Sequence, residues 1–155
     1  MDQVKFEFIS TVFINRLQSL SGEAVGAWGK MNGQQMVEHV SGFFKVSNGK
    51  IIFTLITPAE QLPKYKEFLL SDKPFRENTK APGNVVPEEP VQIRNTSMEE
   101  AINELKNEVS DFITYFTKHP GSKTVHPVFG ELDFEEWVLL HYKHVTHHLK
   151  QFELI

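Results

Sequence analysis

The sequence predicts an all-α protein, an antiparallel four-helix bundle with a long irregular connection between its second and third helices. Two observations support this fold class. Four stretches carry apolar residues at three- and four-residue steps, and only a short connection joins the last two. The chain also has 155 residues, of which 40% are hydrophobic and 13 are Phe, enough for one compact core. We therefore expect residues 1–155 to form a single helical-bundle domain.

The first two helices are predicted from apolar stripes bounded by stop signals. The first runs from about Val4 to Leu20 and ends at Ser21-Gly22. Its stripe comprises Phe6, Ile9, Phe13, Leu17 and Leu20. The second begins near Asn32, a favourable N-cap residue, and ends at Asn48-Gly49. His39 lies in the middle of its apolar stripe.

The region between the second and third helices, residues 48–96, gives the weakest signals. Ile51–Thr57 is rich in apolar residues and suits a short strand or a buried helical segment; helix is favoured because no partner strand is visible. A short helix is expected around Lys64–Leu70, after Pro63. Lys73–Pro90 contains four Pro and one Gly, which predicts a long irregular connection. Such connections in compact domains often carry function.

The last two helices are indicated by their capping sequences. Ser97–Glu100 is a capping box, and apolar residues follow at alternating four- and three-residue steps to about Lys118. The final helix begins at Asp133–Glu136, where an acceptor at the cap is again followed by Glu three residues later. It continues to about Gln151. His119 and the residues up to 132 are expected to form a loop.

Composition excludes several classes of function. Sixteen basic and 20 acidic residues give a net charge of -4, so nucleic acid is not an expected partner. No stretch approaches about 18 uninterrupted apolar residues, and the N-terminus mixes charges where a secretory signal would not, which predicts a cytoplasmic protein without membrane association. The absence of Cys excludes disulfides, thiolate zinc sites and a cysteine nucleophile.

Histidine provides the positive signal, because four of the seven histidines fall within one eight-residue stretch of the last helix, residues 141–148. At 100° per residue, His148 lies 40° from His144, so both imidazoles project from one side, as two ligands of one metal ion must. His39, on the apolar stripe of the second helix, is the expected third ligand. Three neutral imidazoles leave a coordination position for water or substrate, and nitrogen ligands without thiolate favour Zn²⁺ or Ni²⁺.

The sequence leaves the roles of several other residues open. His141 and His147 each lie 60° from His144, so either could replace one ligand. Gln151 lies near the ligand face, where it could bond a ligand imidazole, but a capping role or surface solvation is favoured. His126 could line a pocket mouth or shape the loop, and the loop role is favoured. A histidine on an apolar face is also commonly a hydrogen-bonded core residue, so the cluster could be structural.

Familiar catalytic patterns are missing. The sequence contains no Glu-x-x-His, H-E-x-x-H, Walker A or G-x-S-x-G motif. Glu38 precedes His39 but projects about 100° away and is interpreted as a surface residue. No protein nucleophile, general base or substrate-binding Arg cluster is identified, so the catalytic residues and the substrate are not predicted.

Several sequence blocks resemble the DinB/YfiT-like superfamily of metal-dependent four-helix-bundle proteins. Residues 144–151 resemble its H-x-x-H-H-x-x-Q ending, and Trp28–Asn32 with Gln35–His39 resembles its second-helix block. The segments Ser71–Phe75 and His126–Leu132 are similar to an uncharacterised bacterial subgroup. The resemblance touches most of the chain, but only the second-helix and C-terminal blocks are specific.

The resemblance carries the superfamily's metal ligands onto the same three histidines, His39, His144 and His148. Members of known activity are transferases or isomerases that depend on a low-molecular-weight thiol, which the metal holds as thiolate. The resemblance therefore implies a divalent metal cofactor and a thiol or water as the activated group.

We therefore expect a metal-dependent enzyme of transferase or hydrolase type that acts on a small molecule. The alternative is a non-catalytic bundle that binds a small ligand or partner and keeps the histidines as a structural cluster. A symmetric homodimer is a further alternative, for which the apolar Leu139 and Tyr142 are weak hints.

Overall fold

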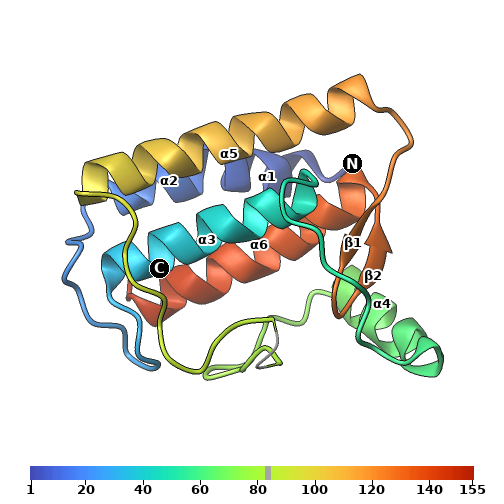
Figure 1. Ribbon diagram of the computed structural model, residues 1–155, viewed down its shortest axis with the longest axis horizontal. Coiled ribbons are helices and arrows are strands. Elements are labelled where there is room, and N and C mark those ends of the chain that lie inside the picture. The colour runs from blue at the N-terminus through green and yellow to red at the C-terminus, as the bar shows by residue number, and fades with distance from the viewer. Residues whose placement is uncertain (83–84) are drawn as a thin grey trace.

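The computed structural model describes residues 1–82 and 85–155 of the chain, which are mostly helical with one small two-stranded sheet (Figure 1). The helices are α1 (Gln3–Glu7), a π-helix (Phe8–Val12), α2 (Phe13–Leu17), α3 (Gly33–Ser47), a 3₁₀ turn (Ala59–Gln61), α4 (Leu62–Leu70), α5 (Met98–Lys118) and α6 (Phe134–Gln151). The strands are β1 (Thr124–His126) and β2 (Gly130–Leu132). Residues 83 and 84 of the predicted irregular connection lie outside the described residues.

The first helical segment is confirmed, with an unpredicted π-helical stretch inside it. The chain stays helical from α1 through α2, and Phe8–Val12 adopts the wider π geometry. Ser10 donates its hydroxyl to the carbonyl of Phe6 within this region. The regular helix ends at Leu17, three residues before the predicted end. Its predicted stripe faces the core, with Ile9, Phe13 and Leu17 almost fully buried.

The predicted starts of the three long helices are confirmed by their capping contacts. Asn32 accepts from the backbone N–H of Gln35, whose side chain accepts from the Asn32 N–H. Asp133 and Glu136 form the same reciprocal pair at α6. Ser97 accepts from the backbone of Glu100 at α5. Each cap satisfies backbone donors that a helix leaves unpaired at its start.

The long helices pack lengthwise around a shared apolar core. Helix α3 runs along α5, and α6 contacts α3 and the N-terminal helical segment (Figure 1). Helix α4, which confirms the short helix expected there, packs against α6. The largest fully buried side chains include Phe13, Phe44, Leu105, Phe112 and Trp137. No helix in the described part of the chain is both long and apolar enough to cross a membrane.

The favoured helix over Ile51–Thr57 was wrong, because this segment has neither helical nor strand structure. Gly49, with a φ of +77°, ends α3 and turns the chain away from it. Phe53 packs against the core, whereas Ile52 is 86% exposed. A helix would also have to run into Pro58, which disfavours helical geometry in the residue before it.

The β1–β2 hairpin was not predicted. Its antiparallel strands pair Thr124 with Leu132 and His126 with Gly130. Strands of three residues are too short for periodicity to reveal. The hairpin links α3 to α6, because Thr124 Oγ1 donates to the carbonyl of Ser47 and accepts from the indole N–H of Trp137.

Candidate metal centre

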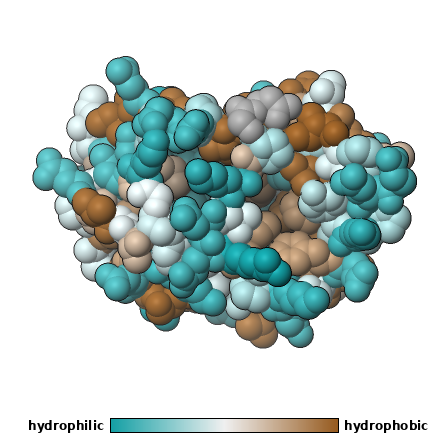
Figure 2. Space-filling view, turned by 90° about the horizontal axis from the view of Figure 1, so that it is seen from below, coloured by the Kyte–Doolittle hydropathy of each residue, from teal (hydrophilic) through white to brown (hydrophobic). Residues whose placement is uncertain are grey.

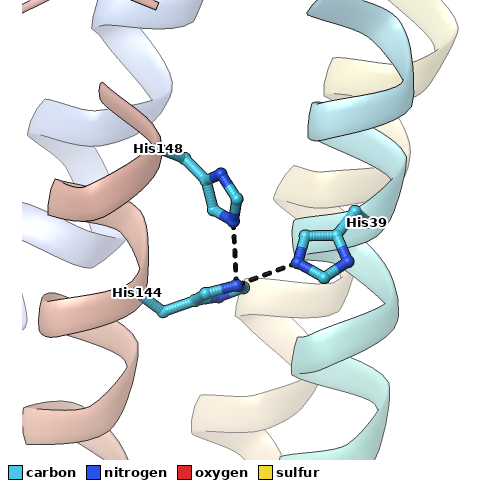
Figure 3. Close-up of side chains that lie close together, drawn as sticks. All are labelled: His39, His144 and His148. Carbon is cyan, nitrogen blue, oxygen red and sulfur yellow. Dashed lines mark hydrogen bonds between the residues drawn. The ribbon is translucent and has the colours of Figure 1, made fainter. Parts of the chain in front are cut away.

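Two helices bring the three predicted ligands together. His39 lies on α3, and His144 and His148 lie one turn apart on α6. Their side chains point into the space between the two helices (Figure 3). Each residue offers one ring nitrogen, and the three nitrogens lie within 4.8 Å of one another. Within the described residues, this is the one group of His, Asp or Glu side chains with such geometry.

The three Nε2 atoms meet at distances that suit a common ion. His144 Nε2 lies 3.0 Å from His39 Nε2 and 3.0 Å from His148 Nε2. Nitrogens bound at about 2.0–2.1 Å to one ion lie roughly 2.8–3.4 Å apart for bond angles between a right angle and tetrahedral. The observed separations therefore fit a small divalent cation without a large movement of either helix.

Gln151 fixes the tautomer of His148. Its amide nitrogen donates to the backbone carbonyl of Trp28 at 2.8 Å, which leaves Oε1 facing His148 Nδ1 at 2.7 Å. An amide oxygen only accepts, so Nδ1 carries the proton of the neutral ring and the lone pair is on Nε2. Gln151 thus bonds the imidazole of His148 and does not take the capping or surface role that the sequence favoured.

Direct contacts among the rings leave hydrogen-bonding capacity unsatisfied. Because His148 Nε2 carries a lone pair, a single shared proton can satisfy only one of the two contacts made by His144 Nε2. The Nδ1 atom of His144 is buried without a partner, and this holds whether or not its Nε2 binds a metal. A divalent cation would instead accept one lone pair from each of the three Nε2 atoms. The three imidazoles are therefore better satisfied by a shared metal ion than by hydrogen bonds to one another.

Burial keeps these imidazoles neutral. Removal from water lowers the pKa of His39 to about 4 and lowers the pKa of His144 and His148 well below the usual value for histidine. Neutral imidazole is the form that binds metal, so no proton has to be displaced near neutral pH.

The two alternative ligands lie elsewhere. His141 is fully buried, stacks on Phe44 at a ring separation of 3.7 Å and contacts Ser47 Oγ through Nε2 at 2.9 Å. His147 is partly exposed and lies outside the group of converging nitrogens. His126, in β1, accepts the backbone N–H groups that follow it in the turn, which is the loop-shaping role favoured from the sequence.

Aromatic rings lie beside the histidine trio and beside the neighbouring His147. The ring of Phe43 lies 4.2 Å from that of His144. The His147 ring contacts that of His148, and also lies 5.5 Å from the ring of Trp28 and 6.1 Å from that of Phe75. Figure 2 shows that the lower face of the molecule is hollowed, with apolar side chains in and around the hollow. The sequence did not indicate Phe75 or Trp28 as neighbours of the site, because both lie on irregular connections.

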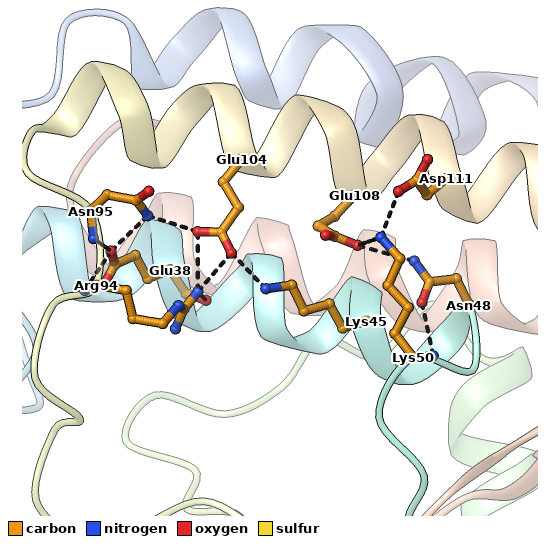
Figure 4. Close-up of polar contacts among 9 residues, drawn as sticks. All are labelled: Glu38, Lys45, Asn48, Lys50, Arg94, Asn95, Glu104, Glu108 and Asp111. Atoms are coloured by element: carbon orange, nitrogen blue, oxygen red, sulfur yellow. Dashed lines mark hydrogen bonds and ion pairs between the residues drawn. The ribbon is translucent and has the colours of Figure 1, made fainter.

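The interpretation of Glu38 as a surface residue was wrong. Its carboxylate is buried and accepts from the backbone N–H groups of Arg94 and Asn95 (Figure 4). These bonds attach the end of the long connection to α3, at the residue that precedes His39 in the sequence. Hydrogen bonds from Lys45, Asn95 and Arg94 outweigh burial and lower the pKa of Glu104 to about 2, so a second carboxylate supports the same attachment.

A second polar cluster joins α5 to the C-terminal end of α3. Glu108 accepts from the side chains of Asn48 and Lys50, and Lys50 also pairs with Asp111 at 2.5 Å (Figure 4). Both polar clusters lie along the α3–α5 contact rather than beside the three imidazoles. We therefore assign them to holding the helices that position His39.

Comparison with known proteins identifies one family. The sequence profile of a family described as "Protein of unknown function (DUF1569)" matches residues 2–154. No curated protein matches the chain significantly.

Proposed function

The chain belongs to the DUF1569 family, and we propose that it is a metal-dependent enzyme in which His39, His144 and His148 hold one divalent ion. The observation that carries this proposal is the convergence of three neutral imidazoles, each with one ring nitrogen within 4.8 Å of the others. We further propose that its long helices form an antiparallel four-helix bundle of the DinB/YfiT-like kind. The packing of α6 against α3 and the N-terminal segment supports this arrangement.

Zn²⁺ and Ni²⁺ are the proposed metals, because the ligands are nitrogen and the chain has no thiolate. An ion held by three imidazoles would bring the pKa of a water or thiol in its open position toward neutrality. Such activation suits a transferase with a low-molecular-weight thiol cosubstrate, or a hydrolase. The chain's own residues hold the ligands in register and limit access of water to them.

Particular side chains hold the three imidazoles in place and limit the access of water to them. Gln151 orients the His148 ring and keeps its Nε2 lone pair free. Phe43 covers one face of His144, and the aromatic rings of Trp28 and Phe75 flank the approach beside His147. An aromatic surround suits an apolar group on the small-molecule substrate. No side chain of the chain is assigned as nucleophile.

Metal analysis tests the proposal. Protein purified without chelator and without a polyhistidine tag should contain about one equivalent of Zn or Ni per chain. The double variant His144→Ala, His148→Ala should contain almost none, whereas His119→Ala, which changes an exposed histidine, should match wild type. Equal metal contents in wild type and the double variant would contradict the proposal.

Cobalt substitution then separates the two reaction types. For a thiol-dependent transferase, adding common cellular thiols to the Co²⁺ protein should change its visible absorption saturably. For a hydrolase, the spectrum should respond to pH and not to thiols.

A specific observation favours one competing function, a non-catalytic ligand- or partner-binding protein with a structural histidine cluster. The Nε2 separations of 3.0 Å within the trio are also hydrogen-bonding distances between imidazoles. That alternative predicts no thermal stabilisation by Zn²⁺ or Ni²⁺, whereas a tightly bound metal raises the melting temperature by mass action.

A further inference from the structure

A partly open cavity lies on the opposite side of α6 from the three histidines. Tyr142 and Thr146 line it, and each is about 160° around the helix from His144. The cavity, here called the rear pocket, has a volume of about 290 Å³ and lies between α6, the N-terminal helical segment and the chain that follows α4. It shares no residue with the three histidines.

The rear pocket is basic in a chain that is acidic overall. Four of its lining residues are lysines, Lys5, Lys73, Lys143 and Lys150, against one carboxylate, Asp72. The net charge of the whole chain is -4. Lys5 is paired with Asp72 and a second aspartate, but among the described residues no ion pair involves the other three lysines. Uncompensated positive charge is therefore concentrated at this cavity.

Lys143 is fixed in the wall of the pocket. It is buried, and its ammonium donates to the backbone carbonyls of Ser71 and Lys73 at 2.5 and 2.6 Å. The same ammonium lies 4.8 Å from the ring centre of Phe68. An ammonium has three donors, so these two bonds leave one N–H available. Immobilisation by the protein removes the entropy cost that a flexible surface lysine pays when it binds an anion.

Thr146 supplies an unpaired hydroxyl. Its Oγ1 is buried and has no hydrogen-bond partner, although buried polar groups are normally paired. The residue lines the same cavity as the lysines. A ligand with several acceptor oxygens would complete the bonding of the hydroxyl and the spare N–H together.

We propose that the rear pocket binds a phosphate group, either inorganic phosphate or the head of a small phosphate monoester. Phosphate presents several acceptor oxygens and close to two negative charges, which match the lysines and the hydroxyl. The volume is well above the roughly 10–15 Å³ of such space that one water molecule needs, and it is enough for phosphate and a short organic group. Leu69 and Leu139 provide apolar wall for that group. The site is independent of the proposed metal chemistry.

Titration calorimetry at constant ionic strength tests the site, with inorganic phosphate, glycerol phosphate and neutral glycerol as probes. Wild type should bind at least one of the two phosphates saturably at millimolar or lower concentration and should not bind glycerol. Tighter binding of glycerol phosphate would assign the site to a monoester, and equal binding would assign it to phosphate itself. Because metal ions also attract phosphate, the same titrations are repeated after chelator treatment, and affinity for the rear pocket should persist.

Substitutions inside and outside the rear pocket test whether phosphate binds there. Thr146→Val removes one hydroxyl at nearly constant volume and should weaken binding about tenfold. Lys150→Gln removes one charge and should weaken it severalfold. Lys118→Gln, at the exposed end of α5, should bind as wild type does.

Thermal unfolding provides a second readout that does not depend on calorimetry. Phosphate should raise the melting temperature of wild type and Lys118→Gln more than that of Thr146→Val. The proposal is overturned if neither phosphate binds saturably, or if Thr146→Val and Lys150→Gln bind and respond as wild type does.

Discussion

Helix α6 carries two kinds of buried histidine one turn apart, and their surroundings differ in one respect. His141 is held by the protein alone: its ring stacks on Phe44 and its Nε2 meets the Ser47 hydroxyl. The Nε2 atom of His144, in contrast, lies 3.0 Å from the Nε2 atoms of both His148 and His39. The contrast indicates that convergence of nitrogen atoms, rather than burial, distinguishes a candidate ligand from a core residue.

The largest expected effect comes from removing the ligand contributed by the other helix. His39→Ala should weaken Zn²⁺ binding by well over about 100-fold, because loss of a ligand exceeds the effect of losing a group that merely orients one. Competition against a chromophoric chelator measures the affinity. The exposed His119→Ala is the control, and equal affinities in the two variants would remove the distinction between ligand and non-ligand histidines.

His141→Ala should have the opposite profile. Deleting a fully buried ring that packs on Phe44 should lower the free energy of unfolding by about 3 kcal/mol. Metal content should stay at the wild-type value. Chemical denaturation and metal analysis of the same preparation measure the two quantities. A variant that lost its metal but kept its stability would reverse the roles assigned to the two kinds of histidine.

Gln151→Leu tests orientation within the trio. Without the amide oxygen, His148 Nδ1 loses its acceptor, and metal affinity should fall roughly tenfold or somewhat more. Gln151→Glu keeps an acceptor at this position and should retain more affinity than Leu. If both variants bound metal as wild type does, Gln151 would serve only the contact with Trp28.

The smallest effect concerns a histidine held by the fold alone. Burial lowers the pKa of His126 to about 3, so the folded state keeps this ring neutral where the unfolded chain would protonate it. Its stabilising contribution is present above about pH 6.5 and is lost as pH falls toward 3, by about 1.4 kcal/mol per pH unit.

His126→Asn keeps an acceptor for the following N–H groups but does not titrate in this range. The variant should therefore show a shallower fall of unfolding free energy between pH 6 and 5. Denaturant unfolding at several pH values, with metal removed, measures the slope; identical slopes would show that His126 does not contribute.

Much of the helical framework could be predicted because its signals are local. The caps at Asn32, Ser97 and Asp133 set the helix starts, and helical spacing put His144 and His148 on one side. His39 followed from its place on an apolar stripe, since that stripe had to face another helix.

The parts that could not be predicted depend on contacts between distant segments. Glu38 is buried only because residues 94 and 95 fold back over it. Phe75 and Trp28 approach His147 along connections whose course no local pattern defines. Ile51–Thr57 has the composition of a buried element but lies largely at the surface, and the short hairpin offered too few residues for periodicity.

X-ray absorption at the zinc edge of the reconstituted protein tests the central claim most directly. The account predicts one ion per chain with three imidazole nitrogens at about 2.0–2.1 Å and, when no thiol is added, one water oxygen completing the set. The scattering from three zinc-bound imidazoles should be lost in His39→Ala. A spectrum without imidazole scattering, or one unchanged by that substitution, would contradict the assignment of His39, His144 and His148 as metal ligands.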